Sequence, residues 1–313
     1  MPMEEYMETA IKIESLGKIY RGVKGKRVEA LKNLNLEILK GEVFGFLGPN
    51  GAGKSTTIRL LTGLISPSSG RFSIGGSNGS LMNCKKMVGY LPENPSFYDY
   101  LTGEEYLSFV GNTFDMKGES IISESERLLT LLDLHGARKR PIRSYSKGMV
   151  QRLGLAQCLI HDPEILILDE PMSGLDPLGR ILVRDIILNL KARGKCVFMS
   201  THILHDIEVI CDRVGIIVRG ELRHLESIQD IMTRGIKGYR IIFNSLSDRV
   251  VDRLRTVGER IGSEKGTLSY YVAKGNMQSL LAEASTDKVT VIQLIEPIRR
   301  GLDELFEEVT RGN

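Results

Sequence analysis

The chain has 313 residues, of which 42% are hydrophobic and 26% charged, and its 42 basic and 39 acidic side chains give a net charge of +3. Such values are typical of a globular protein long enough for two domains, and the balanced charge argues against a nucleic-acid partner. No apolar run approaches the roughly 18 residues that span a bilayer, and the acidic start MPMEEYMETA is not a signal peptide. Four widely spaced cysteines, Cys84, Cys158, Cys196 and Cys211, indicate reduced thiols rather than a metal site.

Short apolar runs alternate with helical stretches from residue 11 to about residue 225. The segments EVFGFL, EILILD, KCVFMS and RVGIIV are continuous runs of the kind found in buried parallel strands. Their connecting helices predict an α/β layer structure. Between about residues 94 and 158 the pattern changes to successive helices, which predicts a helical subdomain inserted in the α/β domain.

A phosphate-binding loop follows the first of these strands. The segment GPNGAGKST matches G-x-x-x-x-G-K-[ST] and stands between a predicted strand and a predicted helix. Its glycines allow successive N–H groups to converge on one anion, Lys54 would reach the β- and γ-phosphates, and the Ser55 hydroxyl would ligate Mg²⁺. The predicted nucleotide-binding residues of this loop are Gly48, Pro49, Asn50, Gly51, Ala52, Gly53, Lys54, Ser55 and Thr56.

Two acidic residues end the strand ILILD. Asp169 would hold Mg²⁺, and Glu170 would polarise the water that attacks the γ-phosphate, because phosphoryl transfer needs positioning and charge neutralisation. The alternative is that both are the solvated start of a loop. That alternative does not explain why Pro171 and the segment SGLD follow immediately.

A second anion site is predicted in the segment SYSKGMVQR. Ser146, Lys147 and Gly148 precede an apolar helical pattern, and the first amides of such a helix have no intrahelical partner. The chain therefore carries two phosphate-binding elements nearly a hundred residues apart.

The order and spacing of five segments resemble those of the ATP-binding-cassette (ABC) ATPases. The resemblance covers about residues 11–225 and implies a P-loop NTPase cassette with its helical subdomain. It also implies that two cassettes pack head to tail, so that Ser146 and Gly148 contact the γ-phosphate held by the other subunit. The segments are Gly48–Thr56, Ser144–Gln151, Ile165–Pro171, Ser173–Asp176 and Ser200–His202.

The same resemblance implies roles for three further residues. Tyr20 would stack on adenine, which is favoured over the alternative of a half-buried strand tyrosine. His202 would contact the γ-phosphate and act with Glu170 and Lys54 in catalysis; the alternative is a surface histidine in a turn. Asp176 belongs to the loop that communicates across the dimer.

Two positions depart from the common family pattern. The signature segment reads Tyr-Ser-Lys-Gly-Met, whereas Leu-Ser-Gly-Gly-Gln is commoner. Glu93 stands where most relatives have a glutamine that touches Mg²⁺ and the attacking water, so it keeps an oxygen ligand and adds negative charge near the metal. The predicted metal ligands are Ser55, Glu93 and Asp169.

A different alternation of strands and helices begins near Gly238. It predicts a small α+β domain over residues 238–313, joined by a linker helix over 226–237. The expected last helix carries an apolar stripe, Ile298, Leu302, Leu305 and Phe306. The stripe either packs on the domain's own sheet or helps to hold two subunits together.

The resemblance implies an ATP-hydrolysing subunit that binds ATP and Mg²⁺, forms a homodimer or paired cassette, and drives a separate membrane permease. The C-terminal domain resembles the tails of cassettes paired with type-2 ABC permeases, which favours export. The expected location is the cytoplasmic face of the membrane. A cassette acting on ribosomes or DNA is the alternative, but such relatives carry two cassettes or long coiled coils.

Overall fold

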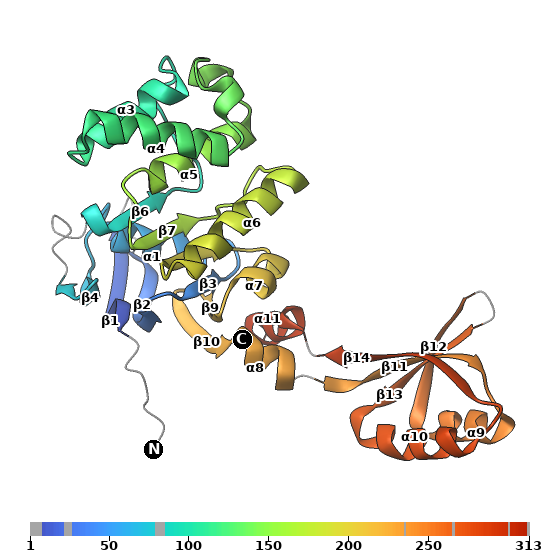
Figure 1. Cartoon of the computed structure of the whole chain (residues 1–313). Coiled ribbons are helices and arrows are strands. Elements are labelled where there is room, and N and C mark those ends of the chain that lie inside the picture. Colours follow the sequence, from blue (N-terminus) through green and yellow to red (C-terminus); the bar gives the residue numbers. More distant parts are fainter. Residues whose placement is uncertain are drawn as a thin grey trace, which may run out of the picture. The chain divides into compact units, whose positions relative to one another are not determined.

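Each of the two units of the chain, Met1–Glu226 and Ser227–Asn313, has its own hydrophobic core (Figure 1). The computed structural model describes residues 8–21, 27–78, 85–234, 236–264, 267–299 and 301–311. Cys84, which the sequence predicts to be a reduced thiol, lies outside the described residues. Cys158, Cys196 and Cys211 are buried free thiols, and burial raises the pKa of Cys196 to about 12.

A six-stranded sheet forms the centre of the first unit. Its strands β9, β3, β8, β7 and β6 pair in parallel with one another, and every residue of β3, β7 and β8 is buried. The apolar runs therefore form the buried parallel strands that the sequence predicts. In spatial order the strands are β10 Glu221–Ser227, β9 Arg213–Val218, β3 Val43–Leu47, β8 Cys196–Thr201, β7 Ile165–Asp169 and β6 Val88–Leu91.

Parallel pairing places the carboxyl ends of these strands at one edge of the sheet. The loops that follow β3, β6, β7 and β8 therefore emerge together, and they contain the predicted phosphate loop, Glu93, Asp169 with Glu170, and His202. Ligands of open α/β sheets bind at this edge. The topology thus gathers residues that are far apart in sequence.

A second, antiparallel sheet covers part of the core. Its first two strands are 13 residues each and pair along most of their length. In spatial order the strands are β2 Arg27–Leu39, β1 Thr9–Arg21, β4 Ser69–Ile74 and β5 Ser77–Asn78.

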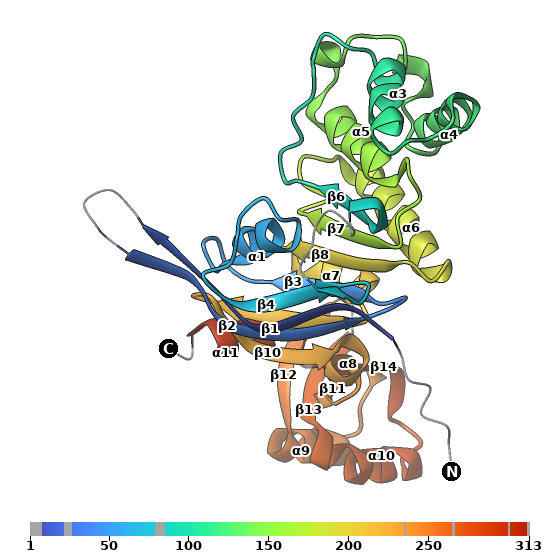
Figure 2. The same ribbon diagram turned by 90° about the vertical axis from the view of Figure 1, so that its left-hand side faces the viewer.

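Helices lie around the central sheet and in a separate group, which Figure 2 shows at one end of the unit. The first set is α1 Lys54–Leu61, α6 Pro177–Ala192 and α7 Leu204–Ile210. The separate group, within the predicted helical subdomain, is α3 Gly103–Thr113, α4 Gly118–Leu131 and α5 Lys147–Leu159, with short 3-10 helices η2 Lys85–Met87, η3 His135–Ala137 and η4 Ile142–Ser144.

Side-chain caps fix where three of these helices begin. Thr102 and Glu105 form a reciprocal capping box at α3, and the Ser146 hydroxyl accepts the Met149 N–H at α5. Asp176 accepts the Gly179 N–H at α6 and is followed by a proline at the first helical position. These caps satisfy first-turn amides that have no backbone partner.

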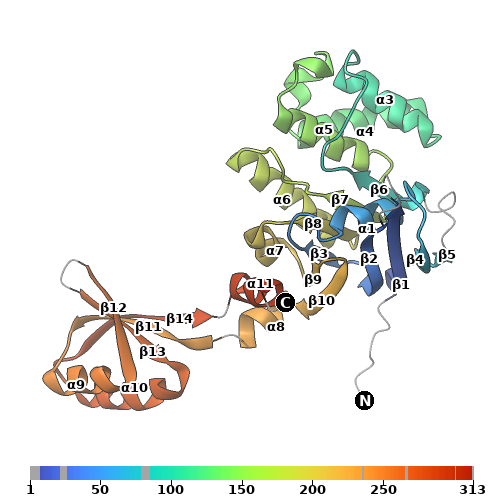
Figure 3. The same ribbon diagram turned by 180° about the vertical axis from the view of Figure 1, so that it is seen from behind.

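The second unit is built from a β-α-β-β-α-β sequence. Its four strands form an antiparallel sheet in the order β12-β13-β11-β14, and helices α9 and α10 lie on one face of it (Figure 3). This is the ferredoxin-like arrangement. The elements are α8 Ile228–Arg234, β11 Ile236–Ser245, α9 Asp248–Val257, β12 Gly258–Glu264, β13 Thr267–Ala273, η5 Lys274–Asn276, α10 Met277–Thr286, β14 Val291–Arg299 and α11 Leu302–Arg311.

The structure corrects two expectations about this region. Ile298 is not in the last helix: it lies in β14, paired with Gly238, because strand pairing with β11 continues to Arg299. The segment 226–237 is not only a linker, since helix α8 belongs to the second unit and strand β11 begins two residues before Gly238. In the described residues, no helix is long and apolar enough to cross a membrane.

Candidate functional site

The loop between β3 and α1 can be built only with glycine at three positions. Gly51 and Gly53 have φ angles of 78° and 115°, in the left-handed region that other residues rarely adopt. A Cβ atom at Gly48 would lie 2.5 Å from the carbonyl oxygen of Ile217. The glycine spacing of the motif thus has a direct steric cause.

Free backbone amides face this loop. Over the described residues, the N–H groups of Lys54, Ser55 and Thr56 donate no hydrogen bond, as expected for the first turn of a helix. Together with the helix dipole they form an anion site. Pro49, Asn50 and Ala52 complete the loop, whose curvature is held by the Ala52 N–H donating to Pro49 at 3.1 Å.

Lys54 lies across the mouth of the loop. Its ammonium group donates to the carbonyl oxygens of Gly48 at 2.6 Å and Pro49 at 3.4 Å, and the residue is 7% exposed. Both partners are neutral, so phosphate oxygens would be stronger acceptors for the same group. The lysine is already positioned over the place where the motif predicts the β- and γ-phosphates.

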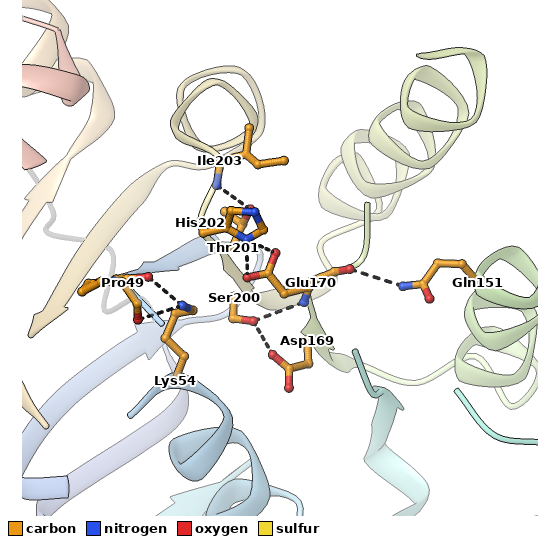
Figure 4. Close-up of polar contacts among 10 residues, drawn as sticks. Pro49, Lys54, Gln151, Asp169, Glu170, Ser200, Thr201, His202 and Ile203 are labelled. Atoms are coloured by element: carbon orange, nitrogen blue, oxygen red, sulfur yellow. Dashed lines mark hydrogen bonds and ion pairs between the residues drawn. The ribbon is translucent and has the colours of Figure 1, made fainter. Parts of the chain in front are cut away.

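One buried hydroxyl organises the acidic pair (Figure 4). Ser200 donates to Oδ1 of Asp169 at 2.5 Å and accepts the Glu170 N–H at 3.2 Å. The Glu170 N–H also donates to the Ser200 carbonyl oxygen at 3.2 Å. Asp169 and Glu170 are both buried, so they do not form a solvated loop start.

Glu170 has an unusual backbone conformation. Its φ of 50° is in the left-handed region, which costs a residue with a side chain roughly 1–3 kcal/mol unless its surroundings fix it. Gln151 on α5 supplies part of that support, because its amide donates at 3.3 Å to the carbonyl oxygens of Glu170 and Pro171. The turn directs the carboxylate away from β7.

The Glu170 carboxylate pairs with His202. The ring nitrogen Nδ1 lies 2.9 and 3.0 Å from the two carboxylate oxygens (Figure 4). A carboxylate only accepts, so Nδ1 carries the proton. The His202 side chain is 59% exposed, and its other nitrogen is available to a ligand. His202 is thus a surface residue that is paired with Glu170, and its contact with the γ-phosphate stays a prediction.

Glu93 lies in the loop after β6, beside the strand that ends in Asp169. It is exposed, and its charge reaches the phosphate loop. Burial lowers the pKa of Lys54, whereas Glu170, Asp169 and Glu93 oppose that lowering. The structure therefore brings Glu93 into the same electrostatic site as the other predicted residues.

Those residues fit a shared Mg²⁺ ion. Within the described ranges, no three His, Cys, Asp or Glu side chains gather to hold a metal by themselves. Mg²⁺ usually takes only one or two protein ligands, with water and substrate phosphates completing its shell. Asp169, which uses one oxygen for Ser200, and Ser55, at the start of α1, satisfy that requirement beside the phosphate loop.

Tyr20 lies near the end of β1, opposite Val28 on β2. Its ring is half-buried, and the Lys18 ammonium group lies 5.4 Å from the ring centroid. This position fits both a strand tyrosine and a stacking surface, so its contact with adenine stays a prediction.

The signature residues lie apart from the phosphate loop of the same chain. Over the residues described, Ser146 and Gly148 make no hydrogen bond or ion pair with Lys54, Asp169 or Glu170. Ser146 caps α5 by accepting the Met149 N–H, and the first turn of that helix leaves further amides without an intrahelical partner. Its geometry suits a phosphate supplied by another molecule.

Sequence reasoning did not assign roles to Ser200 and Gln151. Both lie inside recognised segments, STH and SKGMVQ, yet nothing local shows that their side chains reach the strand end at β7. A polar residue in a buried apolar strand, as Ser200 is in CVFMST, was the one available signal.

The chain matches the family model described as ABC transporter over residues 31–173. An ABC transporter ATP-binding protein of Synechocystis is 47% identical over 72% of this chain, which spans 65% of that relative's length. YcbN of Bacillus subtilis, of the same description, is 32% identical over 98% of this chain and 99% of its own. The bacitracin transport ATP-binding protein BcrA of Bacillus licheniformis is 42% identical over 69% of both chains.

Solved structures of ABC cassettes are similar to this chain in fold. The ATP-binding subunit of an ABC transporter is 29% identical, with a TM-score of 0.65 over 71% of this chain and 92% of its own. A dimeric cassette in a post-hydrolysis state, bound to ADP and Pi, has a TM-score of 0.66 over 70% of this chain and 98% of its own at 24% identity, which shows the shared fold. The chain therefore belongs to the ABC transporter ATP-binding proteins, the ATP-hydrolysing cassettes of these transporters.

Proposed function

We propose that this chain powers an export-type ABC transporter by hydrolysing ATP between two of its copies. The observation that carries the proposal is the constellation at the edge of the central sheet, where Lys54, Asp169, Glu170 and His202 meet a loop of free amides. These groups supply the positioning and charge that phosphoryl transfer needs.

Each residue has a definite task in the proposed reaction. The loop amides and Lys54 hold the β- and γ-phosphates. Ser55 and Asp169 would hold Mg²⁺, which would supply positive charge to the phosphate oxygens. Glu170 accepts a proton from the attacking water. His202, already bonded to Glu170 through Nδ1, orients that carboxylate and offers Nε2 to the γ-phosphate.

The site is complete only when a second chain supplies its signature residues. Ser146 and Gly148 stand at the start of α5, away from their own phosphate loop. In the proposed head-to-tail pair they contact the γ-phosphate on the partner. Two anion sites in one chain then serve two composite sites in the dimer.

An exposed aromatic surface after Glu93 supports docking on a permease. Tyr98 and Tyr100 are 53% and 67% exposed, and Tyr98 packs edge-on against Phe109 with centroids 5.7 Å apart. Aromatic side chains are favoured in protein interfaces. We propose that this surface receives a cytoplasmic loop of the permease, which places the cassette at the inner face of the membrane.

Glu170→Gln tests the chemistry. The amide keeps the shape but cannot accept the proton, so ATP should bind normally while hydrolysis falls at least about a hundredfold. ATP should then hold the variant as a dimer in gel filtration, whereas the wild type should return to monomer. Hydrolysis at the wild-type rate would remove Glu170 as the base.

A further inference from the structure

A buried carboxylate without a partner lies one helical turn beyond His202. Asp206, in the first turn of α7, is 8% exposed, and its Oδ2 atom is enclosed with no hydrogen-bond partner. Its other oxygen also makes no hydrogen bond within the described part of the chain. Buried polar groups are nearly always paired, and leaving one unpaired lowers the stability of the fold.

A cationic side chain on α6, the helix in contact with α7, acts on the charge of Asp206 without bonding to it. The burial of Asp206 raises its pKa, and the charge that most opposes this is that of Arg180 on α6, followed by His205 and His202. In the described chain, the Arg180 guanidinium forms no ion pair or hydrogen bond, so both groups of a possible pair are unpaired.

The two groups lie in the helices that follow the loops of the proposed composite site. Helix α6 begins directly after Asp176, in the loop that the family resemblance directs at the partner, and α7 begins at Leu204, two residues after His202. The helices lie next to each other in Figures 1 and 3. A movement of α6 relative to α7 would bring Arg180 and Asp206 together or apart.

A purely local role does not account for Asp206. An acidic side chain in the first turn of α7 complements the helix dipole, but an exposed carboxylate would do this without the cost of burial. Some contacts form in only one of two conformational states. In the other state such a contact would leave a buried carboxylate and an arginine on the neighbouring helix unpaired, as Asp206 and Arg180 are here.

We propose that Asp206 and Arg180 form an ion pair when ATP and the partner subunit engage, and that this pair positions His202 for hydrolysis. The inference rests on the proposed head-to-tail function. An ion pair between Arg180 and Asp206 would link α6, which follows the loop at Asp176, to α7, which follows His202. Contact of the partner with the loop at Asp176 would then change the position of the histidine that orients Glu170. Asp206 and Arg180 act through His202 and touch no substrate.

The test uses Asp206→Asn, Arg180→Gln and the double variant in the full chain. We expect each single variant to lower kcat about tenfold with ATP Kd unchanged within about twofold, and the double variant to be no slower than either single. Asp185→Asn, an exposed carboxylate on α6 paired with Arg184, is the matched control and should keep wild-type kcat.

Three results would overturn the inference. They are wild-type kcat in both single variants, losses that multiply in the double variant, and a lowered Tm that accounts for the lost activity. Arg180 is only half-buried, so Arg180→Gln keeps the test valid if Asp206→Asn fails to fold. A wild-type chain that does not hydrolyse ATP would instead reject the proposed function itself.

Discussion

The two units of the chain differ in what they bury. In the first unit, Lys54, Asp169, Glu170, Ser200 and other polar residues are enclosed beside the sheet edge. In the second unit, Ser269 is the one polar residue that is buried among those described. Burying a charged side chain costs free energy unless the charge is paired, and such side chains gather at functional sites. The buried charges therefore indicate that the first unit performs the chemistry. The second unit has a core that does little more than hold its fold together.

The largest effect should follow from Lys54→Ala. No other side chain of the phosphate loop offers a positive charge to the β- and γ-phosphates, so ATP affinity should fall at least about a hundredfold. Calorimetric titration with ATP measures this, with Lys32→Ala, a half-buried lysine paired with Glu221, as the control. Unchanged affinity would mean that the nucleotide site lies elsewhere in the chain.

Ser200→Ala should have the next largest effect. The hydroxyl holds both Asp169 and Glu170, and its loss leaves a metal ligand and the proposed base less well oriented. We expect kcat to fall about tenfold and the Mg²⁺ requirement to rise, with little change in ATP Kd at saturating Mg²⁺. Ser200→Thr, which keeps the hydroxyl, should recover part of the rate; equal loss in both variants would indicate a packing effect.

Glu93→Gln should act more weakly. The change removes one negative charge near Lys54 and the proposed metal site while keeping an oxygen ligand. ATPase activity at saturating Mg²⁺ should stay within about threefold of wild type, and the Mg²⁺ concentration for half-maximal activity should rise. A collapse of activity by orders of magnitude would give Glu93 a catalytic role.

Removing the second unit should have the smallest effect on chemistry. The structure moves the appropriate end point from Lys237 to Glu226, because a cut at Lys237 would divide β11. We expect the truncated chain to bind ATP normally and to keep its rate per dimer. Hydrolysis that becomes steeply dependent on protein concentration would show that the second unit supports assembly of the dimer. Loss of ATP binding would show that the second unit is needed for the nucleotide site.

Sequence alone determined the parts of the site that are local. The phosphate loop is one continuous segment whose glycines are required by its own backbone angles, and a buried apolar run ending in Asp-Glu can only deliver those two side chains at a strand end. The α/β fold followed from the same apolar runs. The last strand, β14, was harder to predict. The spacing of Ile298 fits an apolar helical stripe, but strand pairing with Gly238 outweighed that local pattern.

Only the tertiary structure decided how distant segments cooperate. Ser200 joins Asp169 to Glu170, Gln151 supports the strained turn from another helix, and His202 reaches Glu170 across 32 positions of sequence. The proposed pairing of Arg180 with Asp206 likewise depends on the packing of α6 against α7. Parallel strand order is the physical reason, because it brings together strand ends that the chain itself keeps far apart.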